Sequence, residues 1–207
     1  MRSPRPGRAV PTRVLLVCAT LAALHAIVQL TTLPVTGALA AAAPPAYALV
    51  ASLHSLMPFL ARRLTGVRGS ATLTSGIAGV FVAAGSSIGV IALIPLLLTG
   101  AVIDTVVWNS DAEGRRSEPR YLMAAVVAGI VLWAVSLVVF SPDHLTPTII
   151  GGVLLGRIVG ELVIVTLSRA LASALGRAGV GRTLRPTSPA RPYSPAQPNG
   201  SGEIGSS

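Results

Sequence analysis

Residues 70–108 read SATLTSGIAGVFVAAGSSIGVIALIPLLLTGAVIDTVVW and carry a single charged side chain, that of Asp104. About 20 apolar residues suffice to cross the roughly 30 Å hydrocarbon core of a bilayer, so this run is long enough for two crossings. The Gly-Ser-Ser sequence at 85–87 interrupts the run and is typical of a turn. The run therefore predicts a helical hairpin in a membrane, with spans at about 70–86 and 88–108.

The arginines of the chain favour the same division. The chain has 16 basic residues and all of them are arginine. Most lie in four short clusters, at 2–13, 62–68, 115–120 and 177–191. Basic loops stay on the cytoplasmic side of a membrane. A single crossing by 70–108 would place the second and third clusters on opposite sides, and the alternation of basic and non-basic loops would be lost.

This alternation predicts an all-α integral membrane protein, a bundle of six transmembrane helices with both termini in the cytoplasm. A basic N-terminus at 1–13 precedes the membrane domain, which we expect to cover 14–175. The tail at 176–207 is rich in Pro, Ser, Gly and Arg, a composition that predicts disorder. The six helices are expected at about 14–33, 46–61, 70–86, 88–108, 121–140 and 146–175.

Prolines mark the region between the first two spans. Pro34 predicts that the first helix ends or kinks, because proline removes a helical hydrogen bond and restricts the residue before it. The stretch 35–43 is rich in alanine and glycine, and prolines follow it at 44–45. We expect a long or re-entrant outer loop there. Pro58 predicts a kink in the second span.

Composition excludes several classes of protein. With 52% hydrophobic and 11% charged residues, the chain is too apolar for an ordinary soluble domain. We expect a multi-pass protein of the plasma membrane. The net charge of +9 fits membrane topology and anionic lipid better than nucleic acid, because aromatic residues for base stacking make up only 4%. The single cysteine, Cys18, argues against a disulfide framework, a cysteine-rich metal site or redox chemistry. We expect no metal and no cofactor.

The first span has an alternative interpretation. The arginines at 2–13, the apolar run at 14–30 and the small residues at 36–40 resemble a cleavable secretory signal. Cleavage would leave five spans and an external N-terminus. We favour an uncleaved first span, because it keeps the arginine alternation intact.

Two charges within the sixth span are the first candidates for a binding site. Arg157 and Glu161 lie four residues apart, on one face of a helix at membrane depth. A charge in hydrocarbon costs about 2.5 to 3.5 kcal/mol, so the two must pair, face the protein interior or line a wet cavity. They could form a substrate site or a structural pair that fixes helix packing.

Other polar and aromatic side chains at membrane depth extend this candidate site. His25 and His54 fall near mid-depth of the first two spans, with Gln29 one turn outward of His25. Trp133 lies in the outer half of the fifth span and could stack on an aromatic ligand. Histidines in membrane helices also serve simply to hydrogen-bond across helix interfaces, and that alternative stays open.

Two further features suggest contacts between helices or with partners. Asp104, near the inner end of the fourth span, is expected to pair with an arginine of the next loop. Small residues recur at four-residue intervals in the first span and permit close approach of another helix or subunit. We expect partner docking at Ala19, Ala22, Ala23 and Ala26.

Known catalytic motifs are missing from the sequence. It contains no Walker motif, nucleophile elbow or metalloprotease motif, and no clustered acid, base and nucleophile. We therefore do not expect an enzyme. A structural or assembly membrane protein without a ligand is the main alternative to a transport protein.

Three segments resemble the substrate-binding S components of energy-coupling factor (ECF) transporters. They are Leu60-Ala61-Arg62-Arg63-Leu64 with the following Gly69 to Thr74, the segment Gly100-Ala101-Val102-Ile103-Asp104, and the sixth span from Gly151-Gly152-Val153-Leu154-Leu155-Gly156 to Leu171-Ala172-Ser173-Ala174-Leu175. The run 171–180 is most similar to the branch linked to thiamine or its hydroxymethylpyrimidine precursor. The chain departs from that branch at 74–76, where Thr-Ser-Gly replaces an acidic residue in an alanine-rich context, so the ligand stays open.

The resemblance implies a non-catalytic membrane subunit that binds a vitamin-like small molecule from outside. The loop after the first span would act as a lid. A membrane T component and two cytoplasmic ATPase subunits would drive import.

Overall fold

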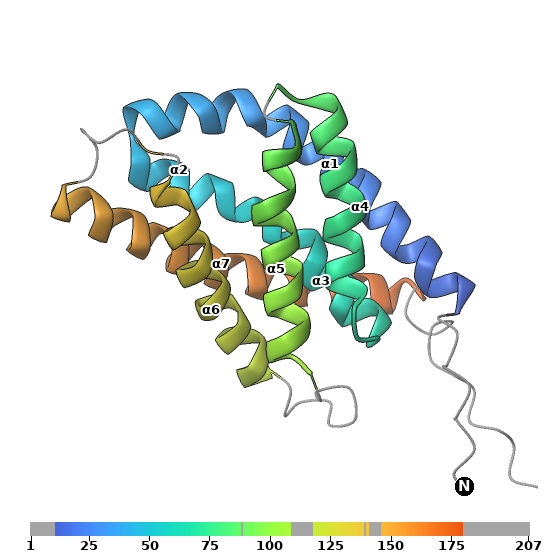
Figure 1. Cartoon of the computed structure of the whole chain (residues 1–207). Helices are drawn as coiled ribbons and strands as arrows, with labels where there is room; N and C mark the ends of the chain where they lie inside the picture. Colours follow the sequence, from blue (N-terminus) through green and yellow to red (C-terminus); the bar gives the residue numbers. More distant parts are fainter. Residues whose placement is uncertain (1–10, 88, 109–117, 139, 141–145, 180–207) are drawn as a thin grey trace, which may run out of the picture.

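The computed structural model describes residues 11–87, 89–108, 118–138, 140 and 146–179, and every regular element in this part of the chain is a helix. Most of the predicted basic N-terminus, of the third arginine cluster and of the tail lies outside the described residues. Figure 1 shows the helices packed as one bundle. In chain order they are α1 (Thr12–Ala42), α2 (Pro44–Ala51), η1 (Ser52–Ser55), α3 (Leu56–Thr65), α4 (Ser70–Gly85), η2 (Gly89–Ala92), α5 (Leu93–Val106), α6 (Glu118–Leu137) and α7 (Pro147–Arg177).

Their length and composition suit a membrane. Four described helices are long and apolar enough to cross one, namely α1, the continuous η2–α5 unit, α6 and α7. The apolar α4 is shorter. The consecutive elements α2, η1 and α3 complete a set of six helical segments. The prediction of an all-helical membrane bundle is confirmed.

The stretch 70–108 forms the two packed helices α4 and α5, which lie side by side in the front of the bundle in Figure 1. Gly100 allows this close approach. A Cβ atom on Gly100 would lie 2.6 Å from the Cα of Thr72 and 2.8 Å from the carbonyl oxygen of Ala71. Gly89 has a φ of 60° where the chain enters α5, a conformation that glycine adopts without strain.

Helix α1 differs from its prediction. The outer loop expected at 35–43 is helical as far as Ala42, and α1 continues through Pro34. It changes direction partway along instead of ending, as the blue segment of Figure 1 shows. The hydroxyl groups of Thr31, Thr32 and Thr36 donate to carbonyl oxygens three and four residues earlier. Such bonds and an internal proline bend a helix without breaking it.

A row of glycines on α7 brings α2 and η1 close to it. A Cβ on Gly156 would lie 2.8 Å from the carbonyl oxygen of Pro45, and one on Gly160 would lie 2.8 Å from the Cβ of Ser52. A Cβ on Gly152, one turn earlier in α7, would also lie close to Pro45. Small residues at four-residue spacing let two helix backbones approach. This contact places the charged residues that follow Gly156 and Gly160 inside the bundle.

The segment 44–65 is not one regular helix. Its middle, η1, has 3-10 geometry and comes directly before α3, in which Pro58 is the third residue. Pro58 cannot donate the helical hydrogen bond that His54 would otherwise accept. A short 3-10 stretch within a helix often accompanies function. Here it directs the buried side chains of His54 and Ser55 toward the other helices.

Candidate functional site

A group of polar side chains, all buried except the half-buried one from α2, lies at the middle of the bundle, where α1, α2, η1, α5, α6 and α7 supply them. We call this group the central polar cluster. Most of its members are connected by hydrogen bonds or by a ring contact, or they lie within electrostatic range of one another. Its residues are His25, Tyr47, His54, Ser55, Thr99, Ser136, Arg157 and Glu161.

Arg157 is 3% exposed, and its guanidinium has few partners for a buried charge. Its Nη2 donates to Ser136 Oγ at 3.1 Å, and its Cζ lies 5.4 Å from the ring centroid of Tyr47, its other polar neighbour. Its Nε and Nη1 have no hydrogen-bond partner among the described residues. Two of its three nitrogens therefore keep free donor capacity.

Glu161 lies one helical turn further along α7 and is fully buried, at 0% exposed. Its Oε1 accepts a 2.7 Å hydrogen bond from Ser55 Oγ, whereas Oε2 has no partner in the described part of the chain. The predicted Arg157 and Glu161 pair thus faces the protein interior. The two side chains form no ion pair, because Arg157 turns to α6 while Glu161 turns to η1.

The ring of His54 is fixed by two neighbours. Its Nδ1 hydrogen-bonds to the carbonyl oxygen of Ala51, and its Nε2 lies 3.2 Å from Thr99 Oγ1. A carbonyl oxygen can only accept, so Nδ1 carries a proton, while the hydroxyl of Thr99 also donates to the carbonyl oxygen of Pro95 at 2.7 Å. His54 also lies within electrostatic range of Arg157 and His25. It connects α1 to α7 across the site.

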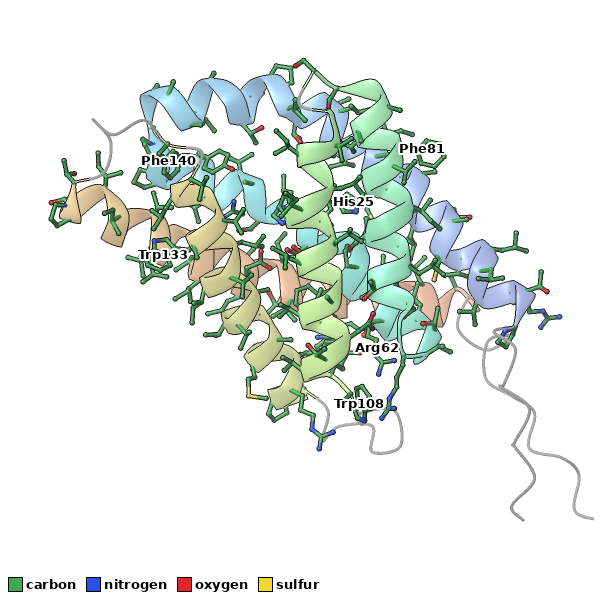
Figure 2. The ribbon with its side chains drawn as sticks, in the orientation of Figure 1. His25, Arg62, Phe81, Trp108, Trp133 and Phe140 are labelled. Carbon is green, nitrogen blue, oxygen red and sulfur yellow. The ribbon has the colours of Figure 1, made fainter. Side chains whose placement is uncertain are left out.

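His25 is the least satisfied member of the cluster. It is 1% exposed, and neither Nδ1 nor Nε2 has a hydrogen-bond partner within the described ranges. Figure 2 shows it in the middle of the bundle, beside α4 and α5. Imidazole always carries at least one N–H donor. A buried imidazole ring whose two nitrogens lack hydrogen-bond partners among the described residues can therefore bind a polar group.

The other two predicted site residues lie at or beyond the edge. Gln29 follows His25 by one turn of α1, is half-buried and makes no described side-chain hydrogen bond. Trp133 packs with Tyr47 and Phe140, and its Nε1 donates to the carbonyl oxygen of Ile150 at 3.1 Å. Figure 2 shows Trp133 far from His25, on the outer side of the bundle. The structure does not bring Trp133 together with the histidines.

Four members of the central polar cluster were missed by reasoning from the sequence. Three are hydroxyl residues of apolar segments, and such residues are common in membrane helices, so they gave no distinct signal. The fourth is an aromatic residue at the start of a span, where aromatic residues usually mark the membrane surface. The four are Tyr47, Ser55, Thr99 and Ser136.

A second polar group lies toward the end of the bundle that holds Arg62 and Trp108 in Figure 2. Arg62 is 0% exposed, its Nε lies 3.7 Å from Asp104 Oδ1, and its Nη2 donates to the carbonyl oxygen of Val107 at 2.9 Å. Asp104 Oδ2 accepts from the amide and hydroxyl of Thr72, at 2.8 and 2.7 Å. The described partner of Asp104 is Arg62 of α3, which precedes it in sequence. The arginines of the next loop, at 115 and 116, lie outside the described residues, and their pairing with Asp104 stays a prediction.

Arg63 lies beside this pair and joins three helices. Its guanidinium makes a bidentate contact with Glu118 at 3.0 and 3.1 Å and donates to Ser168 Oγ at 3.0 Å. Its Cζ lies 3.9 Å from the ring centroid of Tyr121. Unlike the central polar cluster, this end therefore has charged groups that contact opposite charges directly, as expected of a structural network.

The small residues of α1 divide between two surfaces. Ala22 and Ala26 are buried inside the chain, and Ala26 packs near Val82 and Leu96. Ala19 and Ala23 are exposed on the outer face. Only Ala19 and Ala23 are therefore open to a partner.

The described residues contain no group of three or more His, Cys, Asp or Glu side chains that could hold a metal ion. The chemistry of the central polar cluster is that of hydrogen bonding and charge. Arg157 offers hydrogen-bond donors, Glu161 offers an acceptor, and the imidazole of His25 offers both.

Comparison with known proteins gives one informative match. No protein-family model and no curated protein matches the sequence. Among solved structures, the fold is similar to that of an S component of an ECF transporter, with a TM-score of 0.75 and 18% sequence identity. The match covers 85% of this chain and 90% of that chain. At this identity the match shows the fold, which is that of an S component.

Proposed function

We propose that this chain is the substrate-binding membrane subunit, or S component, of an ECF-type ABC importer for a vitamin or vitamin precursor such as thiamine or hydroxymethylpyrimidine. It binds and releases its ligand without changing it chemically, so it is not an enzyme. A membrane T component and cytoplasmic ATPase subunits complete the importer in the plasma membrane, with both termini of this chain in the cytoplasm.

One observation carries the proposal: five buried hydrogen-bonding atoms that lack partners among the described residues lie in the central polar cluster of a chain with the fold of an S component. Each such atom costs about 1 to 3 kcal/mol when left unsatisfied. A polar ligand supplies the missing partners. The atoms are His25 Nδ1 and Nε2, Arg157 Nε and Nη1, and Glu161 Oε2.

The surrounding elements have roles in the same scheme. The part of α1 that follows its bend takes the place of the expected lid, and Gln29 lies between that part and His25. Trp133 supports Tyr47 from outside the cluster. The exposed Ala19 and Ala23 form the docking face for the T component, because small side chains let a partner helix approach closely.

The second candidate is a structural or assembly protein without a ligand. The ion pairs of Arg62 with Asp104 and of Arg63 with Glu118 favour it, because they tie helices together. This candidate predicts that no small molecule changes the stability of the protein.

A thermal-shift screen of the full chain in lipid nanodiscs separates the two. The panel contains thiamine, hydroxymethylpyrimidine, riboflavin, biotin, pantothenate, folate, pyridoxine and niacin. Binding of one compound, lost in Arg157→Ala and Glu161→Ala variants that still elute as single species, supports the S component. Absence of any shift across the panel rejects it.

A further inference from the structure

We infer that the ligand of the central polar cluster carries an acidic group, such as a carboxylate, and that Arg157 binds this group. The inference rests on the proposed function and narrows the substrate to an acidic vitamin or precursor. It keeps the role of an S component but replaces the two example ligands, thiamine and hydroxymethylpyrimidine, because neither carries an acidic group.

The arginines inside the described bundle differ in how their charge is balanced. The Nε atom of Arg62 lies 3.7 Å from a carboxylate oxygen of Asp104. The guanidinium of Arg63 makes a bidentate contact with Glu118. Arg157 is 3% exposed, yet it makes no ion pair with any residue that the structure describes, and its hydrogen bond goes to a hydroxyl. Because a buried charge without a counter-charge is costly, Arg157 requires an anionic group from elsewhere.

Glu161 does not contact Arg157, although their spacing of four residues allows a pair on one helix face. Its Oε1 accepts from Ser55 of η1, whereas Arg157 turns to α6. The two residues also differ chemically. A buried carboxyl group can become neutral by taking up a proton, but a guanidinium cannot lose its proton in a protein. The charge of Arg157 is therefore the one in the cluster that proton transfer cannot remove.

The other neighbours of Arg157 supply no negative charge. The ring centroid of Tyr47 lies 5.4 Å from its Cζ, and a phenol is neutral at physiological pH. His54 lies within electrostatic range, and an imidazole is either neutral or positive. The missing counter-charge is thus not provided by these side chains in any of their usual protonation states.

The hydrogen bonds of Arg157 leave the right atoms for an acid. Its Nη2 donates to Ser136 Oγ at 3.1 Å, and the Ser136 hydroxyl donates in turn to the carbonyl oxygen of Leu132 at 2.7 Å. This chain holds the guanidinium in place, while Nε and Nη1 have no partner among the described residues. A guanidinium only donates, so both atoms need acceptors. A carboxylate offers acceptor oxygens together with the opposite charge, whereas an amide or a ring nitrogen offers only the acceptor.

Pairs of an acid and its uncharged derivative test the inference on the wild-type chain in nanodiscs. The pairs are nicotinate with nicotinamide, pantothenate with pantothenol, and biotin with biotinamide. Each pair keeps nearly the same shape and changes the charge. We expect the acid of a pair that binds to do so at least about tenfold tighter than its derivative by calorimetry, because hydrogen bonds between charged partners are the stronger ones.

Variants of Arg157 provide the second arm. Arg157→Gln should abolish the preference for the acid, so that both members of the pair bind with similar affinity. Arg157→Lys keeps the charge and should retain part of the preference. Arg169→Gln is the matched control, because it removes the charge of a 63% exposed arginine on the same helix and should leave the preference unchanged. Gel filtration establishes that a variant is folded, and the wild-type pairs decide where it is not.

The outcomes separate the inference from the proposed function. Tightest binding by an uncharged or cationic compound of the pairs or of the panel, thiamine and hydroxymethylpyrimidine included, overturns the inference but leaves a binding protein. A preference for the acid that survives in a folded Arg157→Gln variant also overturns it. If no compound of the pairs or of the panel binds, the proposed function itself fails.

Discussion

Ser55 Oγ donates a 2.7 Å hydrogen bond to Glu161 Oε1, and this bond joins the 3-10 turn η1 to the middle of α7. It occupies one carboxylate oxygen and leaves the other free. The bond therefore fixes the orientation of the Glu161 carboxylate at the same time as it holds two helical segments together.

Ser55→Ala should destabilise the protein and weaken ligand binding. A hydrogen bond to a charged group contributes about 1.5 to 3 kcal/mol, and its loss leaves both oxygens of Glu161 unsatisfied. Ser52→Ala is the matched control, since the Ser52 hydroxyl donates only to Ala48 of its own segment. Thermal unfolding in nanodiscs should show a clear fall for Ser55→Ala and little change for the control. Equal effects would contradict the role given to Ser55.

His25→Leu should leave the empty protein as stable as the wild type or more so, yet abolish binding. Both ring nitrogens of His25 are buried without partners, and replacing an unsatisfied polar group with an apolar one removes a cost of about 1 to 3 kcal/mol. His54→Leu should destabilise, because it removes bonds to Ala51 and Thr99. Unfolding curves with and without ligand measure both effects. A strongly destabilised His25→Leu variant would show that His25 is structural.

Gly160→Ala should separate η1 from α7 and lower stability by about 1 to 3 kcal/mol, the usual cost of overpacking. Its new Cβ would overlap Ser52. Gly151→Ala on the same helix is the control, because a Cβ there meets nothing within 4 Å. Alanine in place of helical glycine should make the control slightly more stable. Denaturation in mild detergent distinguishes the two, and a Gly160→Ala variant as stable as the control would refute the tight contact.

Asp104→Asn should destabilise the protein by about 3 to 5 kcal/mol, the usual effect of removing one member of a buried ion pair. The fully buried Arg62 would lose its carboxylate partner. Glu118→Gln, at a partly exposed pair with Arg63, should cost less, because solvent screens exposed pairs. Unfolding free energies of the two variants give the comparison. A larger loss for Glu118→Gln would reverse the assigned importance of the two pairs.

Ala19→Phe and Ala23→Phe should reduce co-purification with a co-expressed T component while leaving ligand binding intact. Both alanines are exposed, so a bulky side chain there obstructs a partner and not the core. Ala41→Phe, exposed near the other end of α1, is the control. Pull-down yield and ligand affinity are measured on the same samples. Undiminished yield from both variants would exclude this docking face.

Two physical rules explain what could be predicted from the sequence. The arginine pattern predicted that residues 70–108 form two helices, and this stretch contains α4 and α5. The cost of polar groups in hydrocarbon singled out His25, His54, Arg157 and Glu161, all of which are buried in the central polar cluster.

Contacts between distant segments could not be predicted in this way. Neither spacing nor composition indicated that Asp104 would face Arg62, or that Ser55 would face Glu161 across 106 positions. Pro34 allowed either an end or a kink of the first helix, and its position alone could not indicate that α1 would continue to Ala42. The glycines of α7 were visible at four-residue spacing, yet their contact with α2 depends on tertiary packing.

The buried position of Arg62 also constrains how the chain is made. Its acceptor at Val107 lies 45 residues later in sequence, so α3 leaves the ribosome well before α5 exists. Until α5 has been made, the guanidinium lacks both this acceptor and the carboxylate of Asp104. The burial of Arg62 can therefore be completed only after α5 has been synthesised, so this end of the bundle closes later than the contact of α3 with α4 can form.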